Sequence, residues 1–544
     1  MQQKVMLQTQ PRIAHLSSLS EAQRGAAPPC IRILPQRCHR AAFVPLAEAQ
    51  PRSTKASAAT SSSASSLDWH SNGTQVPLND LPEPDGDWSL PFIGETPEFK
   101  ANHWDWARKR VAKYGPVFRS NIFGSDVIVV TDFVGLQKVF GGAHKLTQWM
   151  TAPSLELLCE GSIEAGKEKA SHQKQRRQQG AAFTPDAMDA YLPRVVATCE
   201  AYLQHWASQD SVNLVPAMGE LSFDFAEGLV VGLGIDGKEK RILAAKWQEF
   251  TKNAFTFTLD LPGTPFNRAR KARDYIMAAI KERVAEKKLE FERGSVKKDT
   301  LLAFYASAKA DEGDPLDEHE LAMNVLLLML AGSDTSRDAH KVLLGVLPEL
   351  PPAIMEELRA EQRRIVEKHG KGFGRAAMAE MRYAEALSRE VLRIWGPADI
   401  LFRLVKEDFE LHGKRIRKGA TILASMLYAK ACDPRLSAGD HTESAIPLHM
   451  DIHQLHASVK PERWLDPSNK LDMAALATFG MGPHSCLGAP LYLQEAKVLL
   501  ALIARGYDVS NATGAPNDWG VSPNAAGGSP AADVFLKFVP HKYV

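Results

Sequence analysis

The sequence lacks several features that would define its class at once. It has no run of about 18 apolar residues, the length that a membrane-spanning helix requires. The most apolar stretch, residues 325–331, is too short and predicts a buried helix. The 65 basic and 64 acidic residues nearly cancel, so no charge excess indicates a nucleic-acid partner. The six cysteines are scattered without a C-x-x-C pair, which argues against a disulfide framework and favours a reducing compartment.

What the chain does have is length and apolar content. It contains 544 residues, of which 44% are hydrophobic, enough for a large buried core. Length alone suggests roughly two to four domains, although one large domain also fits. No internal repeat divides the chain.

Residues 1–66 differ from the remainder in composition. They carry eight Lys or Arg against two acidic residues and are rich in Ser and Ala. This composition is typical of an organelle transit peptide, and the Ser and Ala favour a plastid over a mitochondrion. The alternative is a disordered tail without a targeting role, because such a segment buries too little apolar surface to fold. We expect a linker over residues 67–80 and a single catalytic domain over 81–544.

Beyond the linker, the pattern predicts a mainly α protein with small β-sheets. Residues 81–99 are punctuated by Pro and Gly and predict an irregular lead-in without helix. Residues 117–131 predict a β-hairpin with its turn over Gly124, Ser125 and Asp126. The pattern from about 185 to 400 is mostly helical, and strand signals return near 402–411 and 421–423.

The loop over residues 479–488 carries the strongest chemical signal. Its three glycines and one proline exclude a regular element before Cys486 and let backbone approach a flat ligand closely. A helical pattern follows from residue 492, so Cys486 lies near a helix N-terminus. Free backbone N–H groups and that terminus both stabilise a thiolate. A lone cysteine is otherwise most often a small buried hydrophobic residue.

Two further patterns are informative. One places polar residues inside an apolar helix, and the other is a Glu–Arg pair followed later by a second Arg. Residues 331–336, Ala-Gly-Ser-Asp-Thr-Ser, place Asp334 and Thr335 in an otherwise buried helix, which is costly without a function. The alternative is a capping or core threonine. Glu390 and Arg393 share one helix face at i, i+3, and Arg463 follows in Pro-Glu-Arg-Trp. Alone, that helical pair is common.

In their order along the chain, these motifs resemble those of the cytochrome P450 family. The loop matches F-x-x-G-x-x-x-C-x-G at every fixed position: Phe479, Gly482, Cys486 and Gly488. The resemblance implies the cytochrome P450 fold, haem b as cofactor and Cys486 as the axial thiolate ligand of its iron. It also places His484 beside a haem propionate.

The same resemblance assigns roles to the other motifs. Asp334 and Thr335 would relay protons through water in a helix that opens locally. Arg337 and Asp338 depart from the family, where small or apolar residues are usual. Glu390, Arg393 and Arg463 would form a buried structural network, whose bidentate geometry explains the use of Arg.

Further propionate partners are implied at three positions. His172 and Arg176 resemble the W/H-x-x-x-R element, and Arg403 resembles the strand arginine beside the haem. Two carboxylates on a buried cofactor require such cations. Arg176 has an alternative interpretation, because with Lys174 and Arg177 it forms a basic cluster that would dock an acidic redox partner.

The implied reaction inserts one atom of O₂ into a C–H bond of a small hydrophobic substrate. Its electrons would come from a ferredoxin-like protein in a plastid, or from a flavoprotein reductase at the endoplasmic reticulum surface; contact with a membrane surface stays compatible with the sequence. Residues 81–99 and 261–270 look most like the branch of retinoic-acid hydroxylases, cyanobacterial relatives and sterol and triterpenoid hydroxylases. This favours an isoprenoid substrate such as a carotenoid, retinoid, sterol or terpenoid.

Two rival functions stay open at this level. One is an O₂-independent haem-thiolate lyase or isomerase, against which Asp334 and Thr335 argue. The other is a non-catalytic haem-binding protein, which the departures at Arg337 and Asp338 favour.

The long connection over residues 435–460 holds four histidines. Their spacing could suit zinc, but we favour a solvated surface insertion, because no cysteine or carboxylate set completes a site.

Overall fold

The structure is a computed structural model, and the residues that it describes all belong to one compact unit, Thr74–Val544. The described residues are 76–87, 94–101, 103–122, 124–160, 162, 169–233, 237–295, 297–306, 318–397, 400–426, 428–429, 459–466, 468, 478–514 and 533–541. The expected transit peptide, and all but the last two residues of the 435–460 connection, lie outside them. None of the described helices is long and apolar enough to cross a membrane.

Helices dominate the described chain, as expected. The longer ones are α2 (His103–Tyr114), α5 (Lys169–Gly180), α6 (Pro185–Ala207), α7 (Leu214–Phe225), α8 (Gly237–Asn253), α9 (Pro265–Glu292), α11 (Glu318–Val346), α12 (Pro352–His369), α14 (Arg382–Ile394) and α19 (Ala489–Gly506). Shorter ones are α1 (Thr96–Ala101), α3 (Phe133–Gly141), α4 (Pro153–Leu158), α10 (Leu301–Ala306) and α13 (Arg375–Glu380).

Local sequence explains several helix starts. Thr184 and Thr264 cap α6 and α9, each followed by a proline at the first helical position. A threonine hydroxyl satisfies a free N–H group there, and proline lacks the N–H that would be unsatisfied. The same rule overturns one expectation, because α1 begins at Thr96 inside the stretch expected to be without helix. Pro97 is tolerated in its first turn for this reason.

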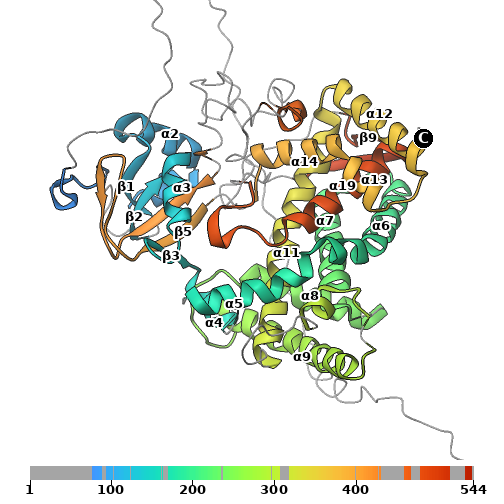
Figure 1. The fold of residues 1–544 in the computed structure, drawn as a ribbon, viewed down its shortest axis with the longest axis horizontal. Helices are drawn as coiled ribbons and strands as arrows, with labels where there is room; N and C mark the ends of the chain where they lie inside the picture. The colour runs from blue at the N-terminus through green and yellow to red at the C-terminus, as the bar shows by residue number, and fades with distance from the viewer. Residues whose placement is uncertain are drawn as a thin grey trace, which may run out of the picture. The chain divides into compact units, whose positions relative to one another are not determined.

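A five-stranded sheet stands beside α2 and α3, apart from the main helical body (Figure 1). Its order is β1 (Val117–Ile122), β2 (Ser125–Val130), β8 (Thr421–Ser425), β5 (Ile400–Val405) and β3 (Thr147–Met150). The expected hairpin is confirmed with a shorter turn: β1 and β2 pair antiparallel, and Gly124 turns the chain at a φ of 72°. Ser125 and Asp126, expected in the turn, already belong to β2, where they pair with Ile122 and Asn121. Smaller sheets combine β4 (Val212–Asn213), β10 (Phe535–Pro540) and β9 (Tyr507–Asn511), and β6 (Phe409–Leu411) with β7 (Lys414–Ile416).

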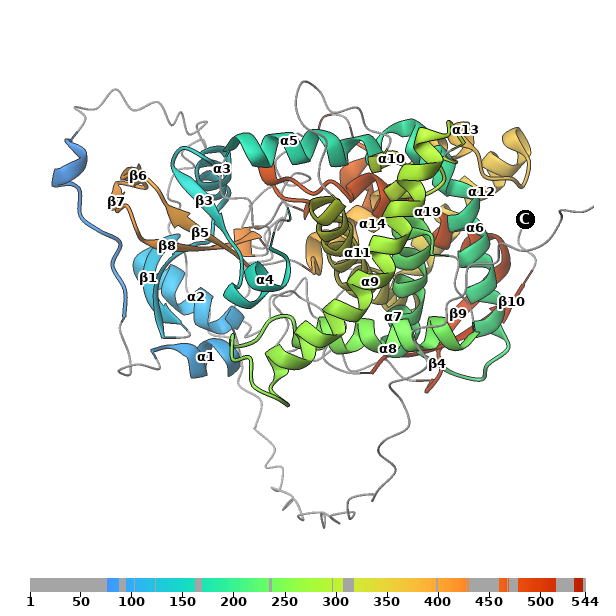
Figure 2. The ribbon, with the colours of Figure 1, turned by 90° about the horizontal axis from the view of Figure 1, so that it is seen from below.

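Helix α11 lies in the middle of the helical body, where it contacts α7, α9, α14 and α19 (Figure 2). Within its apolar run, Val325, Leu326, Leu327, Met329 and Leu330 are buried, as expected, whereas Ala331 at its end is exposed. One feature was not expected: α7 continues into a π-helical segment, Ala226–Val231, which ends at Gly232 in the left-handed region with a φ of 68°. The resulting fold is mainly α with small sheets, which confirms the predicted class.

Candidate active site

Two backbone contacts shape the cysteine loop: one joins its two ends, and the other joins it to α3. The Cys486 N–H donates to the Phe479 carbonyl at 2.7 Å, which closes the loop on itself. Within it, one turn of 3-10 helix spans Gly482–His484. Gly482 has a φ of 68°, and a β-carbon there would lie 2.5 Å from the Phe140 carbonyl oxygen at the end of α3. Only glycine therefore lets this loop pack against α3.

The Cys486 sulfur faces the start of α19. Its Sγ accepts hydrogen bonds from the N–H groups of Gly488 and Ala489. Cys486 is exposed, but the protein atoms around its sulfur still raise the pKa of the thiol, while these two N–H groups and the charge of Arg176 lower it; the pKa ends above its ordinary value. The two N–H groups and Arg176 thus favour the thiolate that the sequence predicts, whereas the surroundings of the sulfur oppose it. A metal ion at the sulfur would supply the missing charge, because a coordinating thiol is deprotonated outright.

Part of the middle of α11 is exposed, between two buried stretches of the helix at residues 321–327 and 339–346. Ala331, Gly332 and Thr335 are exposed, and a β-carbon at Gly332 would meet no atom within 4 Å. The Thr335 hydroxyl donates to the Ala331 carbonyl at 2.6 Å. The helix nevertheless continues unbroken through this segment. This differs from the local opening that the family resemblance implies.

Asp334 is held by the residues that depart from the family pattern. Arg337 Nη1 donates to Asp334 Oδ1 at 2.9 Å, and Arg337 Nε donates to Asp338 Oδ1 at 3.1 Å. Burial raises the pKa of Asp334; the charge of Arg337 lowers it, Asp338 raises it, and the pKa ends above its ordinary value. Asp334 is therefore a carboxyl whose proton affinity depends on its neighbours on the same helix.

The structure brings Glu390, Arg393 and Arg463 together. Both Nε and Nη2 of Arg393 donate to the Glu390 carboxylate, at 3.0 and 2.9 Å, and Arg463 Nε donates to it at 3.1 Å. Sequence reasoning missed two further donors, the Trp464 indole at 2.8 Å and the Lys460 N–H at 3.0 Å. Burial raises the pKa of Glu390, but these partners outweigh it and the pKa ends below its ordinary value. The network ties α14 to the residues before the cysteine loop.

A cluster of basic and aromatic side chains lies beside the loop. Arg403, on β5, is buried and lies over the rings of Phe140 and Trp149, with its guanidinium carbon 4.8 and 4.3 Å from their centroids. His484 stacks on Trp149 with ring centroids 5.4 Å apart. His172, on α5, is buried with its ring centroid 4.0 Å from that of His484. The structure thus brings together His172, Arg403 and His484.

Arg176 also belongs to this region. It lies one turn after His172 on α5 and is half-buried, and its charge lowers the pKa of His172, His484 and the Cys486 thiol. Its neighbour Arg177 is exposed instead. The basic cluster seen in the sequence is therefore divided, with Arg176 at the site and Arg177 at the surface.

Orphaned polar atoms in this cluster test whether haem fits. The Trp149 Nε1 and His172 Nδ1 atoms are buried and have no hydrogen-bond partner within the described part of the chain. With two guanidinium groups alongside, such donors suit the carboxylates of a porphyrin, and the amide-held thiol of Cys486 suits its iron. Trp149 carries no motif, and no signal in the sequence points to it.

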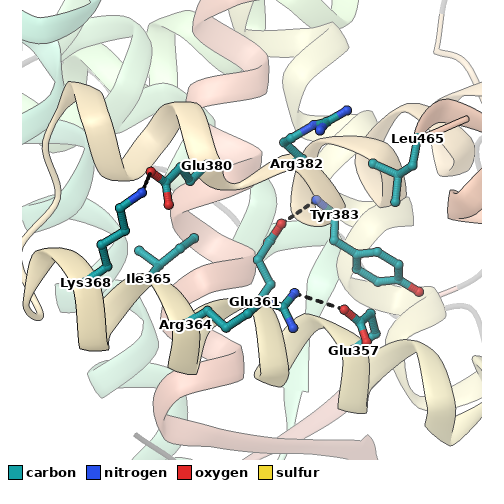
Figure 3. A pocket seen from close by; sticks show the side chains of 9 residues that line it. All are labelled: Glu357, Glu361, Arg364, Ile365, Lys368, Glu380, Arg382, Tyr383 and Leu465. Atoms are coloured by element: carbon teal, nitrogen blue, oxygen red, sulfur yellow. Dashed lines mark hydrogen bonds and ion pairs between the residues drawn. The ribbon is translucent and has the colours of Figure 1, made fainter. Parts of the chain in front are cut away.

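A hollow is lined by residues of α12, α13 and α14, together with Leu465 (Figure 3). Its charged residues largely satisfy one another. Lys368 pairs with Glu380 at 2.7 Å, and Arg364 pairs with Glu357 at 3.0 Å. Glu361 accepts the N–H of Tyr383 and of Ala384 at the start of α14. We interpret this hollow as part of the scaffold that begins α14.

Fold and site together define a haem-thiolate protein. The model of the family described as Cytochrome P450 matches residues 84–434 and 457–519. The chain belongs to the cytochrome P450 family.

Similar proteins agree with this placement. Cytochrome P450 26B1 of Danio rerio is 28% identical over 433 residues, covering 78% of this chain and 81% of that protein. Putative cytochrome P450 120 of Synechocystis sp. is 25% identical over 436 residues, covering 79% and 91%. Among solved structures, retinoic acid bound cyanobacterial CYP120A1 matches with a TM-score of 0.71 at 23% identity, covering 85% of this chain and all of that one. The expected resemblance to cyanobacterial relatives is confirmed.

Family membership settles the coarse function. The protein is a haem monooxygenase, an oxidoreductase whose cofactor is bound through a cysteine thiolate. It uses a small substrate, O₂ and an electron-donor partner. The expected fold, cofactor and enzyme class are confirmed.

Proposed function

We propose that Cys486 is the thiolate ligand of the haem and that the enzyme hydroxylates a retinoid-like isoprenoid. The observation that carries the proposal is the Cys486 sulfur, which accepts two backbone N–H groups at the start of α19 within reach of the charge of Arg176. When bound, haem supplies the reductive activation of O₂. One oxygen atom enters a C–H bond, and the other leaves as water after two electrons and two protons are taken up.

The residues of the chain divide this work. His172, Arg176, Arg403 and His484 hold the two propionates. Asp334 and Thr335, on the exposed middle of α11, hold and pass protons through water. Thr335 releases the Ala331 carbonyl when its hydroxyl turns toward that water, because one hydroxyl hydrogen serves one acceptor at a time. The Glu390 network keeps the cysteine loop in place without contacting substrate.

The proteins to which this chain is similar support a retinoid-like substrate. One similar solved structure is described as holding retinoic acid, and cytochrome P450 26B1 proteins are among the similar sequences. The test is a titration of the oxidised enzyme with retinoids, carotenoids, sterols and terpenoids, monitored by the low-spin to high-spin shift of the Soret band. We expect retinoids to give the largest shift at the lowest concentration. A larger response to sterols would redirect the assignment.

The electron donor and the location are part of the proposal. The basic, acid-poor composition of residues 1–66 supports import into a plastid, where a ferredoxin-like protein would supply the electrons. Exposed Arg177 offers such an acidic protein a positive contact beside the site. A fluorescent fusion of the full chain should accumulate in plastids, and ferredoxin should support faster turnover than a flavoprotein reductase. Mitochondrial or reticular fluorescence would contradict this part.

The ligand assignment is tested by Cys486→Ser. The reduced wild-type enzyme with carbon monoxide should show the red-shifted Soret band of a haem thiolate. The variant should lose that band because a serine hydroxyl stays protonated and binds iron weakly. Cys199→Ser, which changes a buried cysteine on α6, serves as the control and should keep the band. A band that persists in Cys486→Ser would show that another residue is the ligand.

A further inference from the structure

Three imidazoles, not two, gather beside the cysteine loop. His144 joins His172 and His484, and one ring nitrogen from each lies within 4.8 Å of the others. The ring centroid of His144 is 5.0 Å from that of His172 and 5.1 Å from that of His484. The three come from separate segments: the turn after α3, helix α5 and the 3-10 turn of the loop. No motif in the sequence singles out His144.

The backbone of His144 adds a second observation. Its φ is 72°, in the left-handed region that residues with a β-carbon rarely adopt. Its N–H donates to the Thr147 carbonyl at 2.8 Å, which holds the turn closed. A side chain kept in such a conformation is expected where the surrounding structure requires it, and such positions cluster at functional sites. Only one other non-glycine residue of the described chain has a positive φ, His412 at 50°.

The two histidines differ in what their side chains contact. His412 Nε2 lies 3.0 Å from Asp132 Oδ2, so its imidazole has a partner. His144 Nε2 is buried and has no hydrogen-bond partner within the described residues, and the same holds for His172 Nδ1. Because buried polar atoms are nearly always hydrogen-bonded, these two imidazole nitrogens are expected to bind a group from outside the described chain.

Charge decides which kind of ligand fits. Three imidazoles by themselves would suit a transition metal such as zinc. Here, however, Arg403 lies over the Trp149 ring, on which His484 stacks, and Arg176 lies one turn after His172 on α5. The pKa of His144 is lowered by burial and by the charges of Lys169, Lys406 and Arg403. Fixed cations repel a metal ion and attract an anion, so the cluster favours a carboxylate.

We propose that His144 is a third imidazole of the cradle that anchors a haem propionate, together with His172 and His484. It is a binding residue that the family motifs do not include. The proposal rests on the proposed binding of haem at Cys486. Each neutral imidazole donates one N–H to the carboxylate, and the left-handed turn at His144 aims the third ring into the cluster.

The test is His144→Gly in the haem-loaded enzyme. Glycine removes the imidazole and adopts the left-handed turn without strain, so the variant should fold at least as stably as wild type. Haem transfer to excess apomyoglobin should be about tenfold faster, since a hydrogen bond to a charged group is lost. The thiolate band of the carbon monoxide complex should be unchanged. His144→Asn tolerates the turn and retains a donor, so it should show a smaller effect.

The matched control is His412→Gly, which makes the same change at the other left-handed histidine and should leave haem release at the wild-type rate. An unchanged rate in His144→Gly would overturn the proposal. A second result would also overturn it: the apoprotein binds Zn²⁺ stoichiometrically, and His144→Gly abolishes this binding without changing the rate of haem release. If haem is not bound through Cys486, other measurements change: the wild-type carbon monoxide complex lacks the thiolate band, or Cys486→Ser keeps it.

Discussion

At the scale of single residues, the departures from the family pattern carry the most information. Arg337 follows the acid–alcohol pair, where a charged residue is unusual, and it binds Asp334 from one turn away on the same helix. Its neighbour Lys341, buried on the same face, lies 3.6 Å from Asp338. The charges therefore alternate along this face of α11, from Asp334 through Arg337 and Asp338 to Lys341. Each charge is offset by the next, which explains how they are accommodated in a largely buried helix.

This arrangement makes Arg337 a regulator of Asp334. Replacing Arg337 by Met removes a charge that lowers the pKa of Asp334, while burial and Asp338 still raise it. The inflection that Asp334 contributes to the pH profile of kcat should therefore move to higher pH. Arg337→Lys keeps the charge and should lie nearer wild type. An inflection at the wild-type pH in Arg337→Met would count against coupling of these groups.

The role of Thr335 provides the comparison for that experiment. Thr335→Ala should bind haem normally but form less product per O₂ consumed, because the hydroxyl that passes protons is gone. Arg337→Met should shift the pH profile without such a loss at its optimum. The two variants thus separate proton delivery from the tuning of the acid that takes part in it.

At the scale of elements, α14 holds the Pro461–Trp464 turn, which precedes the cysteine loop in the chain. Glu390 is fully buried and accepts N–H groups from α14 itself and from the Pro461–Trp464 turn. The apolar pattern of α14 sets its buried face, and the Glu361 carboxylate caps its start. A helix held at both its N-terminus and its buried face provides a rigid support for the loop.

Glu390→Gln should destabilise the haem-loaded enzyme by about 3–5 kcal/mol, because the buried Arg393 charge loses the carboxylate that offsets it. Thermal unfolding followed by circular dichroism measures the effect. The control is Glu385→Gln on the same helix, where the carboxylate is part-exposed and pairs with Arg389 and Lys497. It should cost no more than about 1 kcal/mol, as for surface pairs. Equal losses in both variants would contradict a special role for Glu390.

At the scale of the whole molecule, a second polar cluster is buried in the core between α11 and α19. His340 Nε2 lies 3.8 Å from Glu495 Oε2, and the Tyr492 ring lies 5.1 Å from that of His340. Burial raises the pKa of Glu495 to about 8 and lowers that of His340 to about 3. Both groups are therefore uncharged in the fold at neutral pH, although each would be at least partly charged in the unfolded chain.

These two shifts predict how stability depends on pH. The folded pKa of Glu495 lies above its ordinary 4.5, so its contribution is complete below pH 4.5 and is lost as pH rises through 8. The contribution of His340 is present above its ordinary 6.5 and is lost as pH falls toward 3. Between pH 6.5 and 8, therefore, Glu495 changes the free energy of unfolding with pH and His340 does not oppose this change.

In that window the free energy of unfolding should fall by about 1.4 kcal/mol per pH unit through Glu495. Glu495→Gln should remove this slope, whereas His340→Gln should leave it and extend it below pH 6.5 to about pH 4.5, because the opposing slope of His340 is gone. Urea unfolding of the haem-loaded enzyme at several pH values measures both. An identical slope in Glu495→Gln and wild type would show that Glu495 ionises normally.

The sequence by itself determined the class of the protein. The spacing around Cys486, the Asp334–Thr335 pair and the order of Glu390, Arg393 and Arg463 depend on neighbours along the chain, so they can be recognised without coordinates. The β-hairpin and the apolar run of α11 follow from local periodicity in the same way. The expected irregular stretch at Thr96 was wrong because a short helix can begin at a proline.

Only the tertiary structure decided what depends on residues far apart in the chain. His144 and Trp149 join His484 across more than 300 residues, and no local pattern marks them. The exposure of Cys486 and the nearby charge of Arg176 likewise depend on packing that the sequence does not reveal. Burial and through-space charge arise when separate elements pack together. Motif spacing therefore predicted the iron ligand, whereas packing decided which groups surround it and with what charge.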